Sequence, residues 1–158
     1  METLHTRVLI GNDHGAVDLK VRLINHLEKR GYTVENCGVD RDDSVDYPDI
    51  ARLVCTRLLE APRQEQEEGP FDFAILCCGT GIGISIAANK IQGIRCALPQ
   101  NIFAATMARE HNDANAIAFG GRIAYEEPVE AMLDAFIDAR HQGGRHQIRV
   151  QKIMDLEG

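Results

Sequence analysis

The chain has 158 residues, a length that suits one domain with a core that needs neither disulfides nor metal. A formal net charge of -7 argues against a nucleic-acid or anionic-membrane surface, because both need a positive field. The five cysteines show no zinc or disulfide spacing, and the sequence has neither a signal-peptide pattern nor a membrane-spanning apolar run. We expect a single domain over 1–158 in a reducing compartment, the cytoplasm.

Strand and helix patterns alternate along the chain. Short apolar runs predict buried parallel strands at 7–11, 32–37, 71–77, 94–98 and 114–119. One-sided apolar periodicity predicts helices at 17–30, 50–59, 84–90, 102–110, 128–139 and 148–156, and the polar stretch 62–70 predicts a loop. This order predicts one doubly wound α/β domain, Rossmann-like or flavodoxin-like. It would have a five-stranded parallel sheet, helices on both faces and a C-terminal helix.

Polar or glycine-rich residues follow four of the predicted strands. They lie at 12–14, 78–83, 99–101 and 120–122. In open α/β sheets ligands bind outside the carboxyl ends of the strands. We therefore expect the chemistry of this protein at that edge of the sheet.

The sequence Cys-Gly-Thr-Gly-Ile-Gly at 78–83 joins a predicted strand to a helix. Glycines let the backbone approach a ligand, and amides at a helix start suit an oxyanion or a phosphate. The third glycine of a dinucleotide fingerprint is missing, since Ile84 occupies its position, and so is the Gly-Lys-Ser/Thr of a P-loop. A tight structural connection is the alternative interpretation.

Cys78 stands at the mouth of this turn. A helix N-terminus favours the thiolate, which would make Cys78 a usable base near neutral pH. The alternative is a buried cysteine that acts as a small hydrophobe, and we favour that interpretation for Cys77. A redox switch between the neighbouring thiols of Cys77 and Cys78 is a third interpretation.

Histidines beside polar partners are further candidates. Asp13 and His14 can bind a sugar hydroxyl or a phosphate, and Asp13 can also cap a helix. His111 can act as a general acid/base with Asn112 as donor to an oxyanion, although a lone loop histidine is usually just solvated.

Arginines near the C-terminal end supply positive charge in an acidic chain. Arg145 and Arg149 are four apart, so they share one face if that segment is helical. Together with Arg122, His141 and His146 they can bind a phosphate, and the alternative is a solvated surface helix. The two histidines do not share a helical face and no other pair has metal spacing, so we expect no metal.

Five motifs in fixed order make the pattern more specific. They are Gly11-Asn-Asp-His14, Asp46-Tyr-Pro-Asp49, the run CGTGIGISIAANK at 78–90, His111-Asn-Asp-Ala-Asn115 and the run GGRHQIRV at 143–150. Over residues 6–155 this set resembles the type B ribose-5-phosphate isomerase family, which includes galactose-6-phosphate isomerase subunits and allose-phosphate isomerases. The resemblance implies an aldose–ketose isomerase of the pentose phosphate pathway. It would interconvert ribose 5-phosphate and ribulose 5-phosphate through a cis-enediolate, without a cofactor, as a homodimer or homotetramer.

The resemblance also implies a role for each site residue. Cys78 would be the base, Thr80 would help to orient or open the sugar ring, and His111 would assist ring opening from a partner subunit. One branch of the family lacks this cysteine and uses a glutamate later in the glycine turn. Ile84 occupies that position here, so Cys78 is the one candidate base in this turn. The substrate-binding residues would be Asp13 and Tyr47 at sugar hydroxyls, Gly79, Gly81, Gly83 and Asn112 at the enediolate, and His14, Arg122, Arg145 and Arg149 at the phosphate, some of them across a dimer interface.

Other functions stay open at this point. The substrate could be a six-carbon sugar phosphate such as allose or galactose 6-phosphate. The chain could also be a non-catalytic sugar-phosphate sensor or a thiol redox sensor. Two stretches, 62–70 and 98–103, depart from the commoner pattern of the family, and the second leaves nearby substrate contacts undefined.

Overall fold

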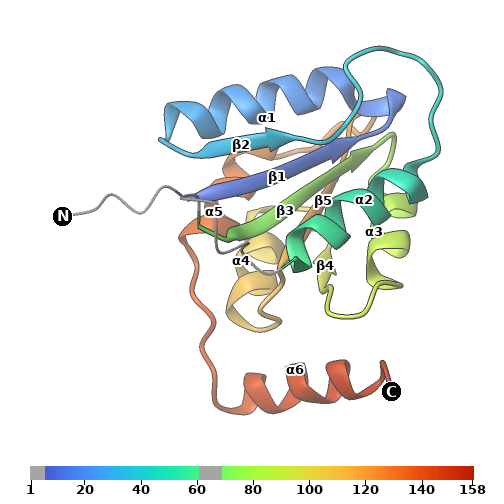
Figure 1. The fold of residues 1–158 in the computed structure, drawn as a ribbon. Helices are drawn as coiled ribbons and strands as arrows, with labels where there is room; N and C mark the ends of the chain where they lie inside the picture. The colour runs from blue at the N-terminus through green and yellow to red at the C-terminus, as the bar shows by residue number, and fades with distance from the viewer. Residues whose placement is uncertain (1–5, 61–68) are drawn as a thin grey trace.

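The computed structural model describes residues 6–60 and 69–158, and Figure 1 shows their fold. The strands are β1 (Arg7–Asn12), β2 (Thr33–Asn36), β3 (Phe71–Cys78), β4 (Cys96–Ala97) and β5 (Ala116–Gly120). The helices are the short η1 (His14–Ala16), α1 (Val17–Lys29), α2 (Tyr47–Leu59), α3 (Ile82–Asn89), α4 (Ile102–Glu110), α5 (Val129–Asp138) and α6 (Arg145–Asp155). Most of the predicted loop at 62–70 lies outside the described residues.

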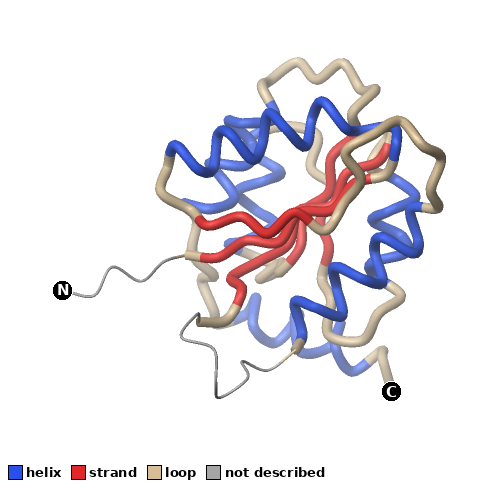
Figure 2. The backbone as a smooth tube through the Cα atoms, turned by 45° about the horizontal axis from the view of Figure 1, so that its top comes forward, coloured by secondary structure: helices blue, strands red, loops and turns tan. Residues whose placement is uncertain are grey.

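The five strands form one parallel sheet in the order β2-β1-β3-β5-β4. Figure 2 shows this sheet between two layers of helices, which confirms the predicted α/β fold and its C-terminal helix. The chain passes from β3 to the edge strand β4 and then returns, so that β5 lies between them. The carboxyl ends of β1, β3 and β5 are therefore neighbours.

Each face of the sheet carries its own apolar core. Helices α1, α4 and α5 cover one face and bury residues such as Leu23, Phe119 and Phe136. Helices α2 and α3 cover the other face. Because successive strand residues point to opposite faces, Cys77 belongs to the first core and Cys78 to the second. Neighbouring cysteines thus have different surroundings.

Some element boundaries differ from the predicted ones. Helix α2 begins three residues early, at Tyr47, because Pro48 fits the first helical turn. Helix α6 begins at Arg145, directly after two glycines with positive φ. Strand β4 has two residues where five were predicted. The α3–β4 turn and α6 lie beside this short edge strand. Helix α6 lies apart from the two helical layers in Figure 1.

Candidate active site

Cys78 is the last residue of β3 and is 4 % exposed. Its Sγ accepts a hydrogen bond from the backbone N–H of Gly81 at 3.1 Å. Gly81 has a φ of +78°, which a residue with a Cβ rarely adopts, and it is the N-cap of α3. The left-handed turn therefore folds the chain back so that a helix start faces the thiol.

The start of α3 is open toward the turn. Gly81 makes no side-chain capping bond, and the hydroxyl of the exposed Thr80 accepts from the N–H of Ile82 at 3.2 Å. The remaining first-turn amides have no partner within the helix and carry partial positive charge. This corner of the fold is suited to a developing negative charge.

Asp13 and His14 follow β1 and lie beside the same turn. The backbone N–H of Asp13 donates to the carbonyl of Cys77 at 3.1 Å, and its carboxylate accepts from the N–H of Gly15 at 2.8 Å. Asp13 is thus the N-cap of η1, which confirms the helix-capping interpretation of this residue. Nδ1 of His14 accepts from the N–H of Val45 at 3.3 Å, so Nε2 is the ring nitrogen that can donate to a ligand.

Tyr47 and Arg122 border the turn on two sides. A Cβ on Gly83 would lie 2.5 Å from Cζ of Tyr47, so only glycine allows this ring against α3. A Cβ on Gly79 would lie 3.3 Å from Nη1 of Arg122. The backbone N–H of Arg122 also donates to the carbonyl of Gly79 at 2.9 Å. A tyrosine from the start of α2 and an arginine from the loop after β5 therefore reach the glycine turn.

These contacts bring together nine of the thirteen predicted site residues. We call them the Cys78 cluster: Asp13, His14, Tyr47, Cys78, Gly79, Thr80, Gly81, Gly83 and Arg122. All of them lie at or just beyond the carboxyl ends of strands or at the start of a helix that follows one. That is the edge at which the sequence predicted the chemistry.

The other four predicted residues form a separate set, the His111 cluster: His111, Asn112, Arg145 and Arg149. The imidazoles of His111 and His146 stack with ring centroids 3.9 Å apart. Burial, followed by the charges of His111, Arg145 and Arg149, lowers the pKa of His146. Helix α6 thus brings its two arginines close to the end of α4.

The two clusters do not meet within one chain. Cys78 ends a strand, whereas His111 ends α4, which runs back from the carboxyl edge of the parallel sheet toward its amino edge. Figure 1 shows the start of α6 on the opposite side of the molecule from the tip of β3. The predicted convergence of Arg122 with Arg145 and Arg149 therefore does not occur within one chain.

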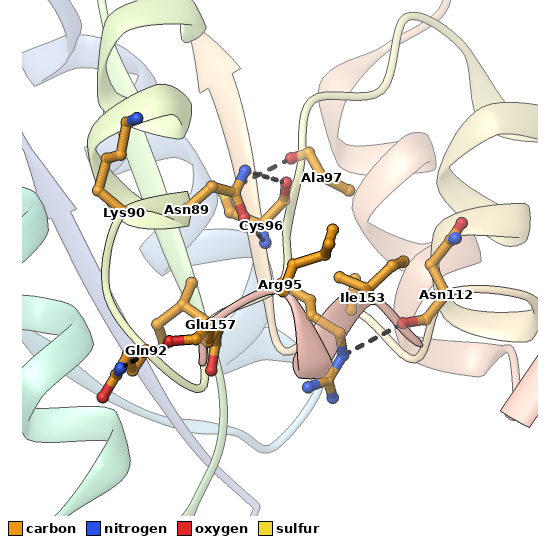
Figure 3. Close-up of a pocket in the computed structure, with 12 residues that line it drawn as sticks. Asn89, Lys90, Gln92, Arg95, Cys96, Ala97, Asn112, Ile153 and Glu157 are labelled. Atoms are coloured by element: carbon orange, nitrogen blue, oxygen red, sulfur yellow. Dashed lines mark hydrogen bonds between the residues drawn. The ribbon is translucent and has the colours of Figure 1, made fainter. Parts of the chain in front are cut away.

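A cavity of about 650 Å³ lies between the α3–β4 turn and α6. Figure 3 shows its lining, which includes Arg95, Cys96, Asn112 and Ile153. Cys78 does not line it, so this hollow belongs to the side of the molecule that carries the His111 cluster.

Two residues to which the sequence assigned no site role, Asn12 of the first motif and Lys20, hold the loop after β2. The side chain of Asn12 makes hydrogen bonds to both the N–H and the C=O of Val39. Lys20, only 1 % exposed, donates to the same carbonyl and pairs with Asp40. The available signal was a lysine on the apolar face of α1, three residues before Leu23.

All five cysteines are free thiols. Burial raises the pKa of Cys77 above the usual range and that of Cys55 to about 12. Burial also raises the pKa of Cys37 to about 11. Cys77 is fully buried among apolar side chains, as expected of a small hydrophobe.

The described part of the chain contains no group of three or more His, Cys, Asp or Glu side chains placed to hold a metal ion. Among its helices, none is long and apolar enough to cross a membrane.

Comparison with known proteins identifies the family. The sequence model of the Ribose/Galactose Isomerase family matches residues 8–153. The chain belongs to this family. Ribose-5-phosphate isomerase B of Escherichia coli K12 is 38 % identical over 151 residues, which cover 96 % of each chain. The protein is accordingly an isomerase.

Solved structures agree with this membership of the ribose/galactose isomerase family. Ribose-5-phosphate isomerase B of Clostridium thermocellum has a TM-score of 0.85 and 43 % identity, with 96 % of this chain and 97 % of that chain covered. The type B ribose 5-phosphate isomerase of Trypanosoma cruzi has a TM-score of 0.84 and 36 % identity, with 96 % of both chains covered.

Proposed function

We propose that this chain interconverts ribose 5-phosphate and ribulose 5-phosphate, an aldose–ketose isomerisation of a sugar phosphate that uses no metal or other cofactor. Its relatives in Escherichia coli and Clostridium thermocellum bear the name of that enzyme. The observation that carries the proposal is the thiol of Cys78, which accepts a hydrogen bond from the N–H of Gly81. An N–H group directed at sulfur stabilises negative charge on it, as a thiolate base requires.

In the proposed reaction Cys78 acts once the sugar ring has opened. The thiolate removes the proton from C2 of the aldose, the electrons of that bond form the C1–C2 double bond, and negative charge develops on O1. The product of this step is a cis-enediolate. The thiol then returns the proton to C1 while the proton on O2 passes to O1, which gives the ketose.

The start of α3 is proposed to stabilise the enediolate. Its amides around Gly79 to Gly83, together with Asn112 of a partner subunit, would donate to the oxygen on which charge develops. Removing one such donor typically costs about 2.7–4 kcal/mol of barrier. Thr80 would orient or open the sugar ring, and His111 of the partner would assist that opening.

The remaining residues would grip the substrate away from the reacting carbons. Asp13 and Tyr47 would bind sugar hydroxyls, while His14 and Arg122 would bind the phosphate from the same chain. The partner would add Arg145 and Arg149, since arginine binds phosphate oxygens in a fork. Binding energy from the phosphate positions C1 and C2 against the thiolate.

A second copy of the chain is needed to complete this site. The Cys78 cluster lies at the carboxyl ends of the strands, and the His111 cluster lies toward their amino ends. A two-fold axis that places the first cluster against the partner's second cluster also makes the reverse contact, which gives two equal sites. We therefore propose a homodimer, or a homotetramer made of two such dimers. Its free cysteines are consistent with the proposed cytoplasmic location.

The test is turnover of ribose 5-phosphate by purified protein in the presence of a chelator, followed as ketose formation. Cys78→Ala is expected to abolish turnover and to retain binding of the phosphate ester, while Cys37→Ala serves as the control for loss of a cysteine elsewhere. Retained turnover in Cys78→Ala would refute the assignment of the base. Faster turnover of allose or galactose 6-phosphate would move the substrate to the six-carbon class.

A further inference from the structure

The turn between α4 and β5 has an unusual backbone. Asp113 has a φ of +46°, and no other residue except glycine has a positive φ in the part of the chain that the structure describes. A left-handed conformation is unfavourable for a residue with a Cβ, and it persists where surrounding contacts enforce it. Asn112, the neighbour of Asp113, is assigned to the enediolate in the proposed function. The contacts that enforce this turn therefore bear on the reaction.

Two kinds of contact hold this turn. The backbone N–H groups of Asp113 and Ala114 donate back to α4, and Arg95, from the stretch before β4, binds the outer side of the turn. Its Nε donates to the carbonyls of Asn112 and Asp113 at 3.3 and 3.0 Å, and its Nη2 donates to the carbonyl of Asp113 at 2.7 Å. Nη2 also lies 3.6 Å from the carboxylate of Asp113. The side chain of Arg95 is 18 % exposed, and its bonds to the carbonyl of Asp113 are partly buried. One guanidinium thus holds two consecutive carbonyls.

Figure 3 shows the orientation that results. Arg95 approaches the backbone carbonyl of Asn112, and the side-chain amide of Asn112 points away from the guanidinium. Asn112 is exposed, so its amide is open to a ligand. The ring of His111 has a separate support in its stack on His146. Of the two groups, Asn112 therefore depends more on Arg95.

We propose that Arg95 is a positioning residue for the isomerisation: it locks the Asn112–Asp113 turn in its left-handed form and thereby aims the Asn112 amide at the partner's substrate. This inference rests on the proposed function, in which Asn112 stabilises the enediolate. A donor that acts on the enediolate affects the transition state more than the bound sugar. Its displacement therefore lowers kcat and leaves KM almost unchanged.

Arg95 also contacts α6, which offers a competing, purely structural role. Its Nη1 donates to Sδ of Met154 at 3.3 Å. If support of α6 were its only role, loss of Arg95 would disturb Arg145 and Arg149, and KM would rise instead of kcat falling. The positioning role therefore predicts a fall in kcat, and the structural role predicts a rise in KM.

The test begins with Arg95→Gln and Arg95→Lys, compared with Arg57→Gln, which removes an arginine that is paired with Glu35. We expect Arg95→Gln to lower kcat by about 10- to 100-fold with little change in KM, as displacement of a reacting group does. Arg95→Lys should resemble it, because an ammonium cannot span two carbonyls as the guanidinium fork does. Melting curves identify any variant that fails to fold.

A second substitution tests the mechanism itself. Glycine adopts positive φ readily, so Asp113→Gly in the Arg95→Gln background is expected to restore part of kcat. A crystal structure of Arg95→Gln is expected to show Asp113 outside the left-handed region. Unchanged kcat, a rise in KM alone, no restoration by glycine, or a retained positive φ at Asp113 would each overturn the inference. If the wild-type protein leaves ribose 5-phosphate unchanged, the proposed function fails, while the crystal structure still tests whether Arg95 locks the turn.

Discussion

The imidazole rings of His111 and His146 lie 3.9 Å apart with 10° between their planes. His146 is 7 % exposed, and its pKa is lowered by burial and by the charge of His111. A neutral His146 therefore presents a flat, uncharged surface to His111. This stack joins α6 to the end of α4 and sets the plane of the ring that is proposed to open the sugar.

The lowered pKa of His146 makes stability depend on pH. An unfolded histidine binds a proton near pH 6.5, so below that value the unfolded chain holds a proton that folded His146 does not. Stability should therefore fall as the pH is lowered through this region. Urea midpoints measured at about pH 7.5 and about pH 5.5 should show a smaller fall in His146→Phe, which keeps a flat ring but cannot titrate. An equal fall in both proteins would contradict the prediction.

Mixed dimers test whether the two clusters complete each other's sites. Cys78→Ala and His111→Ala homodimers should each have defective sites. In a mixed dimer one site carries both changes and the other carries neither. Random mixing should make about half of the dimers mixed, so activity should recover to about a quarter of the wild-type value. The measurement is turnover after joint refolding, and activity no higher than that of the parents would exclude a shared site.

Gly83→Ala should weaken substrate binding through Tyr47. The new Cβ would lie 2.5 Å from Cζ of Tyr47, so the half-exposed ring must move away from the turn. Loss of one hydrogen bond to the sugar is worth about 1 kcal/mol, or a rise in KM of about five-fold. Gly69→Ala is the matched control, because no atom lies within 4 Å of a Cβ at that position. Equal KM values for the two variants would remove Tyr47 from the site.

Gly11→Ala should destabilise the fold without touching the proposed site. A Cβ on Gly11 would lie 2.5 Å from a methyl group of Val54 and 2.9 Å from one of Ile50. Overpacking of this kind typically costs about 1–3 kcal/mol of unfolding free energy. Urea denaturation of Gly11→Ala and Gly69→Ala measures the difference, and similar midpoints would show that α2 can retreat from β1.

The fold followed from the sequence where local chemistry decides it. The apolar run before Asn12 and the spacing of Leu19, Leu23 and Leu27 predict β1 and α1 because burial favours those periods. Boundaries set by caps were less well predicted: Pro48 moved the start of α2, and Gly144 that of α6. The shortness of β4 depends on its place at the sheet edge, which no local pattern encodes.

The site was predictable in part for a topological reason. Residues at or just after the ends of strands, such as Cys78 and Asp13, must gather at the carboxyl ends of a parallel sheet. By the same rule His111, which follows a helix and precedes a strand, belongs at the other edge, although its spacing alone did not predict this. The reach of Arg95 to the Asn112 turn depends on how β4 and α6 lie relative to each other, and the sequence contains no signal for that contact.

The far end of α6 is fastened as well as its start. Both carboxylate oxygens of Glu157 accept from the N–H of Gly93, at 2.9 and 3.1 Å, and the side chain of Gln92 donates to the carbonyl of Glu157. Helix α6 is consequently held at both ends, by the stack of His146 on His111 and by the bonds of Glu157. An affinity tag fused after Gly158 that strained the Glu157 clamp would tilt the arginines several turns away, so kinetic comparisons among variants call for identical carboxyl termini.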